Sequence, residues 1–125
     1  MRHGYRFSWL LMGAAALAAP AGYADCDKAR GAEAFTKCSA CHSLQPGQHL
    51  MGPSLAGLRD RKAGSVEGFA FSAALRASSV AWNAETLDRF IEDPQGTMRG
   101  TAMPFRGIKD ATERAALVCY LLEQQ

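Results

Sequence analysis

The chain carries Cys38-Ser39-Ala40-Cys41-His42, a pair of cysteines separated by two residues and followed directly by a histidine. This spacing is the attachment pattern of a c-type haem. Two thiols can add to the two vinyl groups at one edge of the porphyrin, and the adjacent histidine then lies beneath the iron. The motif therefore predicts one covalent haem on Cys38 and Cys41, with His42 as an iron ligand.

A cysteine pair of this spacing also occurs in thiol–disulfide exchange and as half of a structural zinc site. Thiol exchange would need a βαβ framework, and structural zinc would need four ligands, commonly including a second close pair. In residues 25–125 the other cysteines and histidine, Cys26, His49 and Cys119, are far apart. The sequence therefore favours haem over both alternatives.

Residues 1–24 have the pattern of a signal peptide. Arg2 and Arg6 give a positive start, residues 9–19 are apolar, and small residues precede a cleavage site that we place after Ala24. A retained anchor is disfavoured because a membrane span needs about 20 apolar residues. A lipid anchor is disfavoured because lipoprotein processing resembles cleavage directly before a cysteine with small residues preceding it, whereas Asp25 precedes Cys26. We predict export to the periplasm and no membrane span in the mature chain.

Residues 25–125 are short enough for one domain, and an apolar core of that size is marginal without a cofactor or a cross-link. Removing residues 1–24 takes away Arg2 and Arg6 but no acidic residue, so the 14 basic residues become 12, equal to the 12 acidic ones. A nearly neutral chain has no nucleic-acid-binding footprint.

The periodicity of apolar residues predicts helices and no strands. We expect helices over residues 27–37, 71–78 and 83–92, a last helix that begins at Asp110, and loops over 43–68 and 96–107, where Gly and Pro recur. The predicted fold class is all-α, with helices and long loops wrapped around one haem.

Further motifs stand around the haem motif in a fixed order. They are Gly31 and Phe35 before it, Gly52-Pro53-Ser54-Leu55 after it, Trp82 in mid-chain, and Gly100-Thr101-Ala102-Met103-Pro104-Phe105 near the end. In this order and spacing, residues 31–121 resemble a class I cytochrome c of the mitochondrial and soluble bacterial type. The resemblance implies that residues 25–125 form one monohaem cytochrome c domain.

The resemblance also implies roles for single residues. Met103 would be the second axial ligand, in preference to Met51 and Met98. Pro53 would offer its carbonyl to the far nitrogen of His42. Arg61 and Trp82 would lie near a haem propionate, Thr101 would supply a hydroxyl beside the sulfur, and His49 would fix two loops. Gly31, Phe35, Leu117 and Tyr120 would form the crossing of the first and last helices.

An iron with histidine on one face and methionine on the other has no open position, which favours a carrier of single electrons over an enzyme. The alternatives are a haem sensor or peroxidase-like protein, and a dedicated subunit of one dehydrogenase. We expect a monomer whose partners are redox proteins: a membrane oxidase, a reductase complex or a periplasmic dehydrogenase. Gln95, Gly96 and Ala102 stand where mitochondrial members carry lysines, which implies a weakly steered encounter. Docking would then rely more on an apolar rim around Ala102, Pro104 and Phe105.

Cys26 and Cys119 are left over in what would be an oxidising compartment, and they flank the two helices that the family packs together. The sequence leaves two states open: a disulfide between them, or a buried Cys119 with a mobile Cys26.

Overall fold

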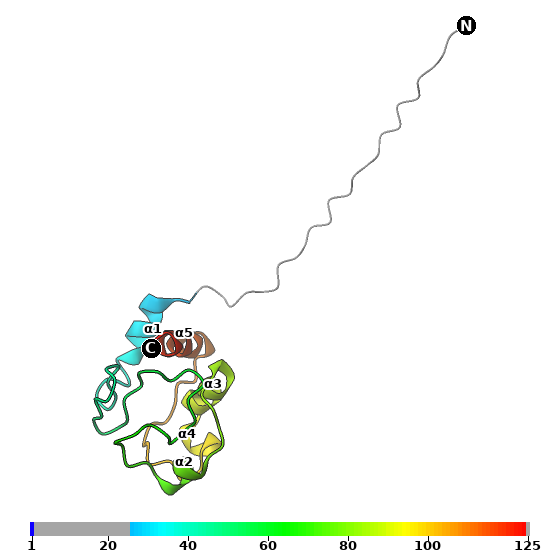
Figure 1. Cartoon of the computed structure of the whole chain (residues 1–125). Coiled ribbons are helices and arrows are strands. Elements are labelled where there is room, and N and C mark those ends of the chain that lie inside the picture. The colour runs from blue at the N-terminus through cyan, green and yellow to red at the C-terminus, as the bar shows by residue number, and fades with distance from the viewer. Residues whose placement is uncertain (2–25, 125) are drawn as a thin grey trace.

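The computed structural model describes Met1 and residues 26–124, and these residues form helices joined by long loops (Figure 1). The helices are α1 (Lys28–Phe35), α2 (Ala73–Ala77), α3 (Ala84–Glu92), α4 (Pro94–Thr97) and α5 (Ala111–Leu122). Outside the helices, the described residues contain two isolated β-bridges, His42 with His49 and Lys62 with Ala81. The prediction of an all-α fold is confirmed, whereas the predicted signal peptide lies, apart from Met1, outside the described residues.

Helices α1 and α5 pack across each other at one end of the molecule, and α2 lies toward the opposite end (Figure 1). The crossing is close because of Gly31. A Cβ atom at this position would lie 2.5 Å from both the Ala116 carbonyl oxygen and Tyr120 Cβ. Phe35 packs against Tyr120 with ring centroids 6.0 Å apart, and Leu117 is fully buried. The four residues expected at the crossing are therefore found there.

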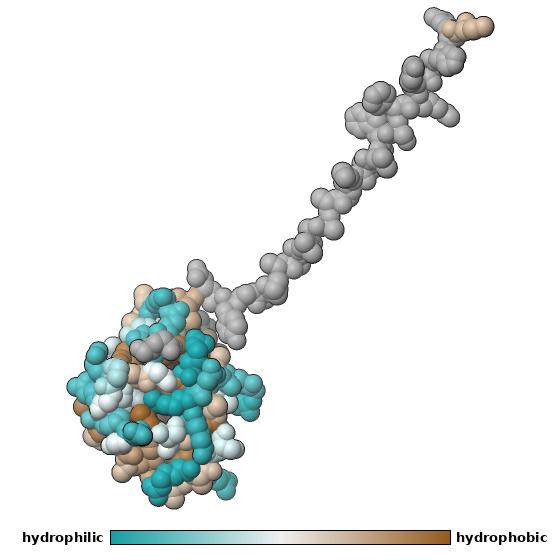
Figure 2. All heavy atoms as spheres, in the orientation of Figure 1, coloured by the Kyte–Doolittle hydropathy of each residue, from teal (hydrophilic) through white to brown (hydrophobic). Residues whose placement is uncertain are grey.

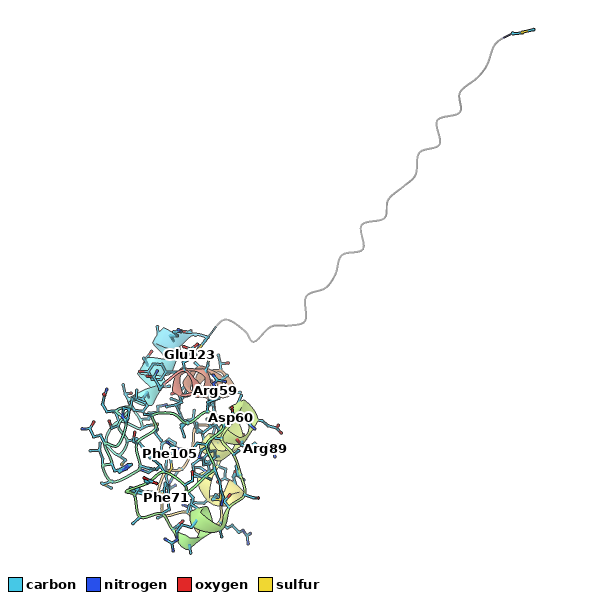
Figure 3. All side chains as sticks on the ribbon, in the orientation of Figure 1. Arg59, Asp60, Phe71, Arg89, Phe105 and Glu123 are labelled. Atoms are coloured by element: carbon cyan, nitrogen blue, oxygen red, sulfur yellow. A yellow bond between two sulfur atoms is a disulfide. The ribbon has the colours of Figure 1, made fainter. Side chains whose placement is uncertain are left out.

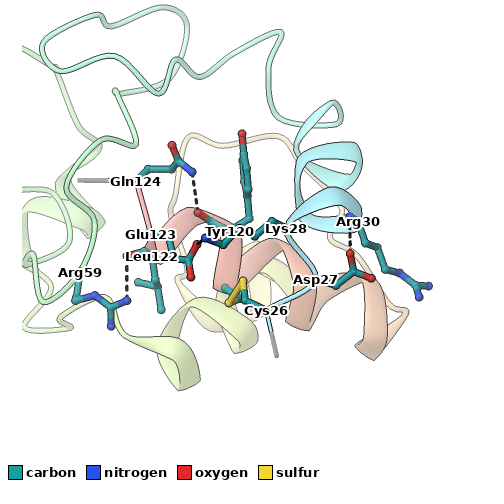
Figure 4. Close-up of a disulfide and its surroundings, with 10 residues drawn as sticks. Cys26, Asp27, Lys28, Arg30, Arg59, Tyr120, Leu122, Glu123 and Gln124 are labelled. Atoms are coloured by element: carbon teal, nitrogen blue, oxygen red, sulfur yellow. Dashed lines mark hydrogen bonds and ion pairs between the residues drawn. A yellow bond between two sulfur atoms is a disulfide. The ribbon is translucent and has the colours of Figure 1, made fainter. Parts of the chain in front are cut away.

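A disulfide joins Cys26 to Cys119 beside this crossing (Figure 4). The two Cα atoms are 5.8 Å apart, within the range that a disulfide spans without backbone movement. Lys28 and Glu123 form an ion pair of 2.8 Å next to it. The bridge ties the start of α1 to α5, and it resolves the two alternatives that the sequence left open.

Side-chain caps explain where three helices begin. Asp27 accepts a hydrogen bond from the Arg30 amide at the start of α1, and Asp110 accepts one from Glu113 at the start of α5. Asn83 and Thr86 form a reciprocal capping box at the start of α3. Each cap satisfies amide groups that have no partner within the helix. These signals are local, so the sequence located these three starts to within one residue.

The short helix α4 corrects the prediction that the chain becomes loop from Gly96. Asp93 accepts a hydrogen bond of 3.0 Å from the Gly96 amide. Pro94 occupies the first turn, where a missing amide hydrogen costs nothing and its fixed φ angle suits a helix. Pro94 is also fully buried. Helices α1 and α2 are shorter than expected, because they end at Phe35 and Ala77.

The core lies between α3, α5 and the loops that face them. Its buried apolar residues are Ala34, Leu58, Ala63, Trp82, Leu87, Phe90, Ile91, Met98, Ile108, Leu117, Val118, Leu121 and Leu122. Arg114 is buried among them because its guanidinium donates to Asp88 at 2.7 Å and to the carbonyl of Ile108 at 3.0 Å. In the part of the chain that the structure describes, no helix combines the length and the apolar character needed to cross a membrane.

The visible face of the molecule carries both polar and apolar side chains. Figure 2 shows polar residues spread over the visible face, with apolar patches between them. Figure 3 places Arg59 and Glu123 near α5, and Phe71 and Phe105 among the loops toward the other end of the molecule. The Arg59 guanidinium donates to the carbonyl of Leu122 at 3.0 Å, so it ties the loop before Asp60 to the end of α5.

Candidate haem-binding site

The haem motif forms a tight turn directly after α1. The amides of Cys41 and His42 both donate to the carbonyl of Cys38, at 3.0 and 2.9 Å. Both cysteines are half-buried and unpaired, whereas Cys26 and Cys119 are joined to each other. The turn therefore presents two free sulfur atoms and one imidazole within a single short segment.

The orientation of the His42 ring is set by Pro53. Nδ1 of His42 lies 2.8 Å from the Pro53 carbonyl oxygen. A carbonyl can only accept, so Nδ1 carries the proton and Nε2 keeps a lone pair for a metal. Burial lowers the pKa of His42 below its ordinary value, although the bond to Pro53 acts in the opposite direction. The ring is therefore held as the neutral tautomer that can ligate iron through Nε2.

The backbone of Gly52 lies directly against the His42 ring. A Cβ atom at Gly52 would lie 2.3 Å from Cε1 and 2.8 Å from Nε2 of His42. The Gly52 amide donates to the carbonyl of Cys41 at 2.8 Å, and this hydrogen bond holds Gly52 against the haem motif. A histidine fixed from one side by a carbonyl and from the other by a glycine backbone suits an axial haem ligand, so the residues present fit the group.

The same geometry argues against the two alternative uses of the cysteine pair. Burial, followed by the proximity of Cys41, raises the pKa of the Cys38 thiol to about 11, whereas thiol–disulfide exchange relies on a lowered value. For zinc, the cluster of three metal-capable side chains found among the described residues consists of Cys26, Cys119 and Glu123. That cluster includes neither cysteine of the motif, and its own two sulfur atoms form the disulfide.

His49 fixes two loops, as the resemblance implied, and both of its nitrogens are used. Nδ1 accepts from the Ser54 amide at 3.0 Å, and Nε2 lies 2.8 Å from the Glu67 carbonyl oxygen. Because Nδ1 accepts, the proton resides on Nε2 and points to that carbonyl. His49 thus joins the loop after the haem motif to a segment 18 residues further along the chain.

Met103 lies on a short loop whose conformation is held by Thr101 and Gln95. The Met103 amide donates to Oγ1 of the buried Thr101 at 3.3 Å. The side chain of Gln95 donates to the carbonyls of Met103 at 2.7 Å and Thr101 at 3.4 Å. The rival methionines differ in exposure: Met98 is buried in the core, and Met51 is 77% exposed. Met103 is half-buried, between these two extremes.

Arg61 and Trp82 lie side by side through backbone pairing. The Trp82 amide donates to the Arg61 carbonyl at 2.9 Å, and the Arg61 guanidinium donates to the carbonyls of Ala56 and Ser54. Burial lowers the pKa of Arg61, but an arginine remains charged in a protein. Trp82 is buried against Phe90 with ring centroids 5.1 Å apart. Their approach to a haem propionate stays a prediction.

The structure therefore brings the predicted site residues into three local groups. Cys38, Cys41, His42 and Pro53 form one, Thr101 and Met103 the second, and Arg61 and Trp82 the third. The contacts of Gln95 and Gly52 were not foreseen from the sequence. No local pattern could have revealed them, since both depend on a residue brought close by folding.

A comparison with protein families matches residues 28–125 to the model described as cytochrome c. The chain belongs to the cytochrome c family. Among curated relatives, cytochrome c2 iso-2 of Magnetospirillum fulvum is 43% identical over 88 residues, which cover 70% of this chain and 92% of the relative. Cytochrome c2 of Blastochloris viridis is 41% identical over 96 residues, covering 76% of each chain.

A solved structure agrees with this assignment. Cytochrome cH from Methylobacterium extorquens matches with a TM-score of 0.72 and 38% identity, covering 76% of this chain and 96% of that one. The fold and the family thus identify a class I monohaem cytochrome c. As a cytochrome c, the protein carries one covalently attached haem c with iron, and the family transfers electrons through that haem.

Proposed function

We propose that this cytochrome c is a periplasmic carrier of single electrons between redox proteins, and that it is not an enzyme. Cys38 and Cys41 would hold the haem by thioether bonds, and His42 and Met103 would be its axial ligands. The observation that carries the proposal is the hydrogen bond of 2.8 Å between His42 Nδ1 and the Pro53 carbonyl, which leaves Nε2 available as a metal ligand in the same motif as two unpaired cysteines.

The two proposed axial ligands explain why carriage is favoured over catalysis. The haem supplies an iron that gains and loses one electron. A thioether sulfur such as that of Met103 favours the reduced state and raises the potential. With His42 and Met103 both bound, no coordination position is left for a substrate. His42 is fixed by Pro53 and Gly52, so a change of charge at the iron would require little movement of this ring.

The disulfide supports the proposed location. Disulfides persist in oxidising compartments such as the bacterial periplasm and are rare in the cytosol. Cys26 and Cys119 are joined in the structure, and the predicted signal peptide would end two residues before Cys26. A membrane oxidase, a reductase complex or a periplasmic dehydrogenase would then be the electron partner.

The central test is expression of the full chain in a bacterium that matures c-type cytochromes. We expect a red periplasmic protein that begins at Asp25 by mass spectrometry and keeps its colour after acid–acetone extraction. The ferric spectrum should show the charge-transfer band of methionine-sulfur ligation, and Met103→Ala should lose it. Colour that moves into the acetone, or a band that survives in Met103→Ala, would contradict the proposed attachment or the proposed ligand.

A turn beside the haem motif offers an uncharged surface to a partner. Leu50 is 47% exposed and Met51 is 77% exposed, and both belong to the turn that Gly52 holds against Cys41. The stretch 38–58 contains no acidic residue, lysine or arginine. Charges at the rim of an interface mainly set the association rate and its salt dependence. We therefore propose that the partner docks on this turn through apolar contacts.

If docking relies on apolar contacts, the rate of electron transfer to the partner should depend only weakly on salt concentration. Oxidation of the reduced protein by bacterial membranes that contain a cytochrome c oxidase should change less than about threefold as the Debye length falls from about 30 Å to about 8 Å. Met51→Lys should introduce a clear salt dependence, because it places a charge inside the contact. Ala115→Lys adds the same charge on α5 and is the control. Equal salt dependence in the two variants would exclude the turn of Leu50 and Met51 as the docking surface.

A further inference from the structure

Burial and two hydrogen bonds hold the short helix α4 in place beside residues 101–103, the loop that carries Met103. Pro94 is fully buried, and Asp93 caps the helix through the Gly96 amide. Thr97 Oγ1 donates to the carbonyl of Arg89 at 3.0 Å, which ties α4 to the last turns of α3. These contacts hold the α4 backbone, and with it the point from which the Gln95 side chain extends.

The Gln95 side chain extends from α4 to the backbone of the loop that carries Met103. Its Nε2 donates to the Met103 carbonyl at 2.7 Å and approaches the Thr101 carbonyl at 3.4 Å. Two carbonyl groups can only accept, so the amide nitrogen, with its two hydrogens, must face them. One side chain thus spans both sides of Ala102.

The other hydrogen bonds of this loop remain close to it in sequence. The Met103 amide donates to Thr101 Oγ1, and the Thr101 amide donates to the carbonyl of Met98 at 3.0 Å. The hydrogen bond from Gln95, in contrast, joins the Met103 carbonyl to the helix α4. The side chain of Gln95 contacts carbonyls and not the sulfur, so any influence on the iron must pass through the position of Met103.

We propose that Gln95 is a positioning residue that holds residues 101–103 against α4 and so keeps the Met103 sulfur on the iron. The inference rests on the proposed function, in which Met103 is an axial ligand. If the loop must open before the sulfur can leave, then the loss of this hydrogen bond makes opening easier. The readout is therefore the rate at which an added ligand displaces the sulfur.

The test is Gln95→Glu in the ferric holoprotein, with imidazole as the displacing ligand. Glutamate has the same shape, but its ionised carboxylate has no hydrogen to donate and repels the two carbonyls. We expect the rate constant for imidazole binding to rise roughly tenfold, since one net hydrogen bond of about 1 kcal/mol and the added repulsion together approach a tenfold factor. Gln95→Leu, which adds no charge, should raise it by a smaller factor of roughly five.

Gln124→Glu is the matched control. Gln124 Nε2 donates to the Tyr120 carbonyl at 3.1 Å near the end of α5, so the control loses the same kind of bond and gains the same charge. Its imidazole rate should stay within twofold of the wild-type rate. An equal acceleration in the control, or an unchanged rate in both Gln95 variants, would overturn the proposal.

The failure of the proposed function gives a different result. In that case the wild-type ferric protein would lack the methionine charge-transfer band and would bind imidazole as fast as Met103→Ala does. If the band is present in the wild type and Gln95→Glu has no effect, the ligand assignment stands and the role of Gln95 is refuted. Denaturant unfolding of each variant checks that the imidazole rates are compared between folded proteins.

Discussion

Replacing Cys26 and Cys119 together with alanine is expected to lower the free energy of unfolding by about 4 to 5 kcal/mol. The disulfide joins residues 93 positions apart, so it closes most of the mature chain into one loop and restricts the unfolded state strongly. In the chain-entropy account, a disulfide that closes a loop of about 100 residues stabilises the folded state by roughly 4.7 kcal/mol. Denaturant unfolding of the oxidised holoprotein and the double variant measures the difference.

Reduction of the wild-type protein gives an independent measure of the same effect. A reductant should lower the stability of the wild type to that of the double variant and should leave the double variant unchanged. Thiol titration of the denatured, unreduced wild type should find no free thiol, because Cys38 and Cys41 would be thioethers. Two free thiols per chain would show that the bridge does not form in the protein as produced.

Gly52→Ala is expected to displace the His42 ring and to destabilise the holoprotein by about 3 kcal/mol. The added methyl group would overlap the imidazole, with 2.3 Å to Cε1 and 2.7 Å to Nδ1, and no flexible side-chain end is available to move aside. Overpacking of a tight site costs 1–3 kcal/mol and occasionally more. The bond from Nδ1 to Pro53 should break, so the Nδ1 hydrogen resonance of His42 should lose its protection from exchange and the midpoint potential should shift.

Gly47→Ala is the matched control on the same loop. A Cβ atom at Gly47 would meet nothing within 4 Å, but its φ angle of 71° is left-handed. The control should therefore cost about 1 kcal/mol for the backbone alone, with an unchanged His42 resonance and potential. A Gly52→Ala protein with a wild-type potential and a protected Nδ1 hydrogen would show that the ring is not seated on this glycine.

The parts of the fold that the sequence predicted well are those set by neighbouring residues. Asp27, Asn83 and Asp110 cap helices through amides three residues away, so a short window of sequence contains the whole interaction. The haem motif is equally local, because one tight turn brings Cys38, Cys41 and His42 together. The prediction of a loop from Gly96 was wrong because the burial of Pro94 and the hydrogen bond from Thr97 to α3, which support α4, come from packing.

By itself, the sequence of this cytochrome c determined the haem-attachment motif and the helical class. The choice of Met103 as the second axial ligand came through a resemblance and stays a prediction. Only the tertiary structure decided that Cys26 meets Cys119, that Gly52 seats the His42 ring, and that Gln95 holds the Met103 backbone. The physical reason is distance along the chain. A cap is complete within one helical turn, whereas a disulfide across 93 residues depends on how α1 crosses α5, and that crossing depends on the packing of Gly31.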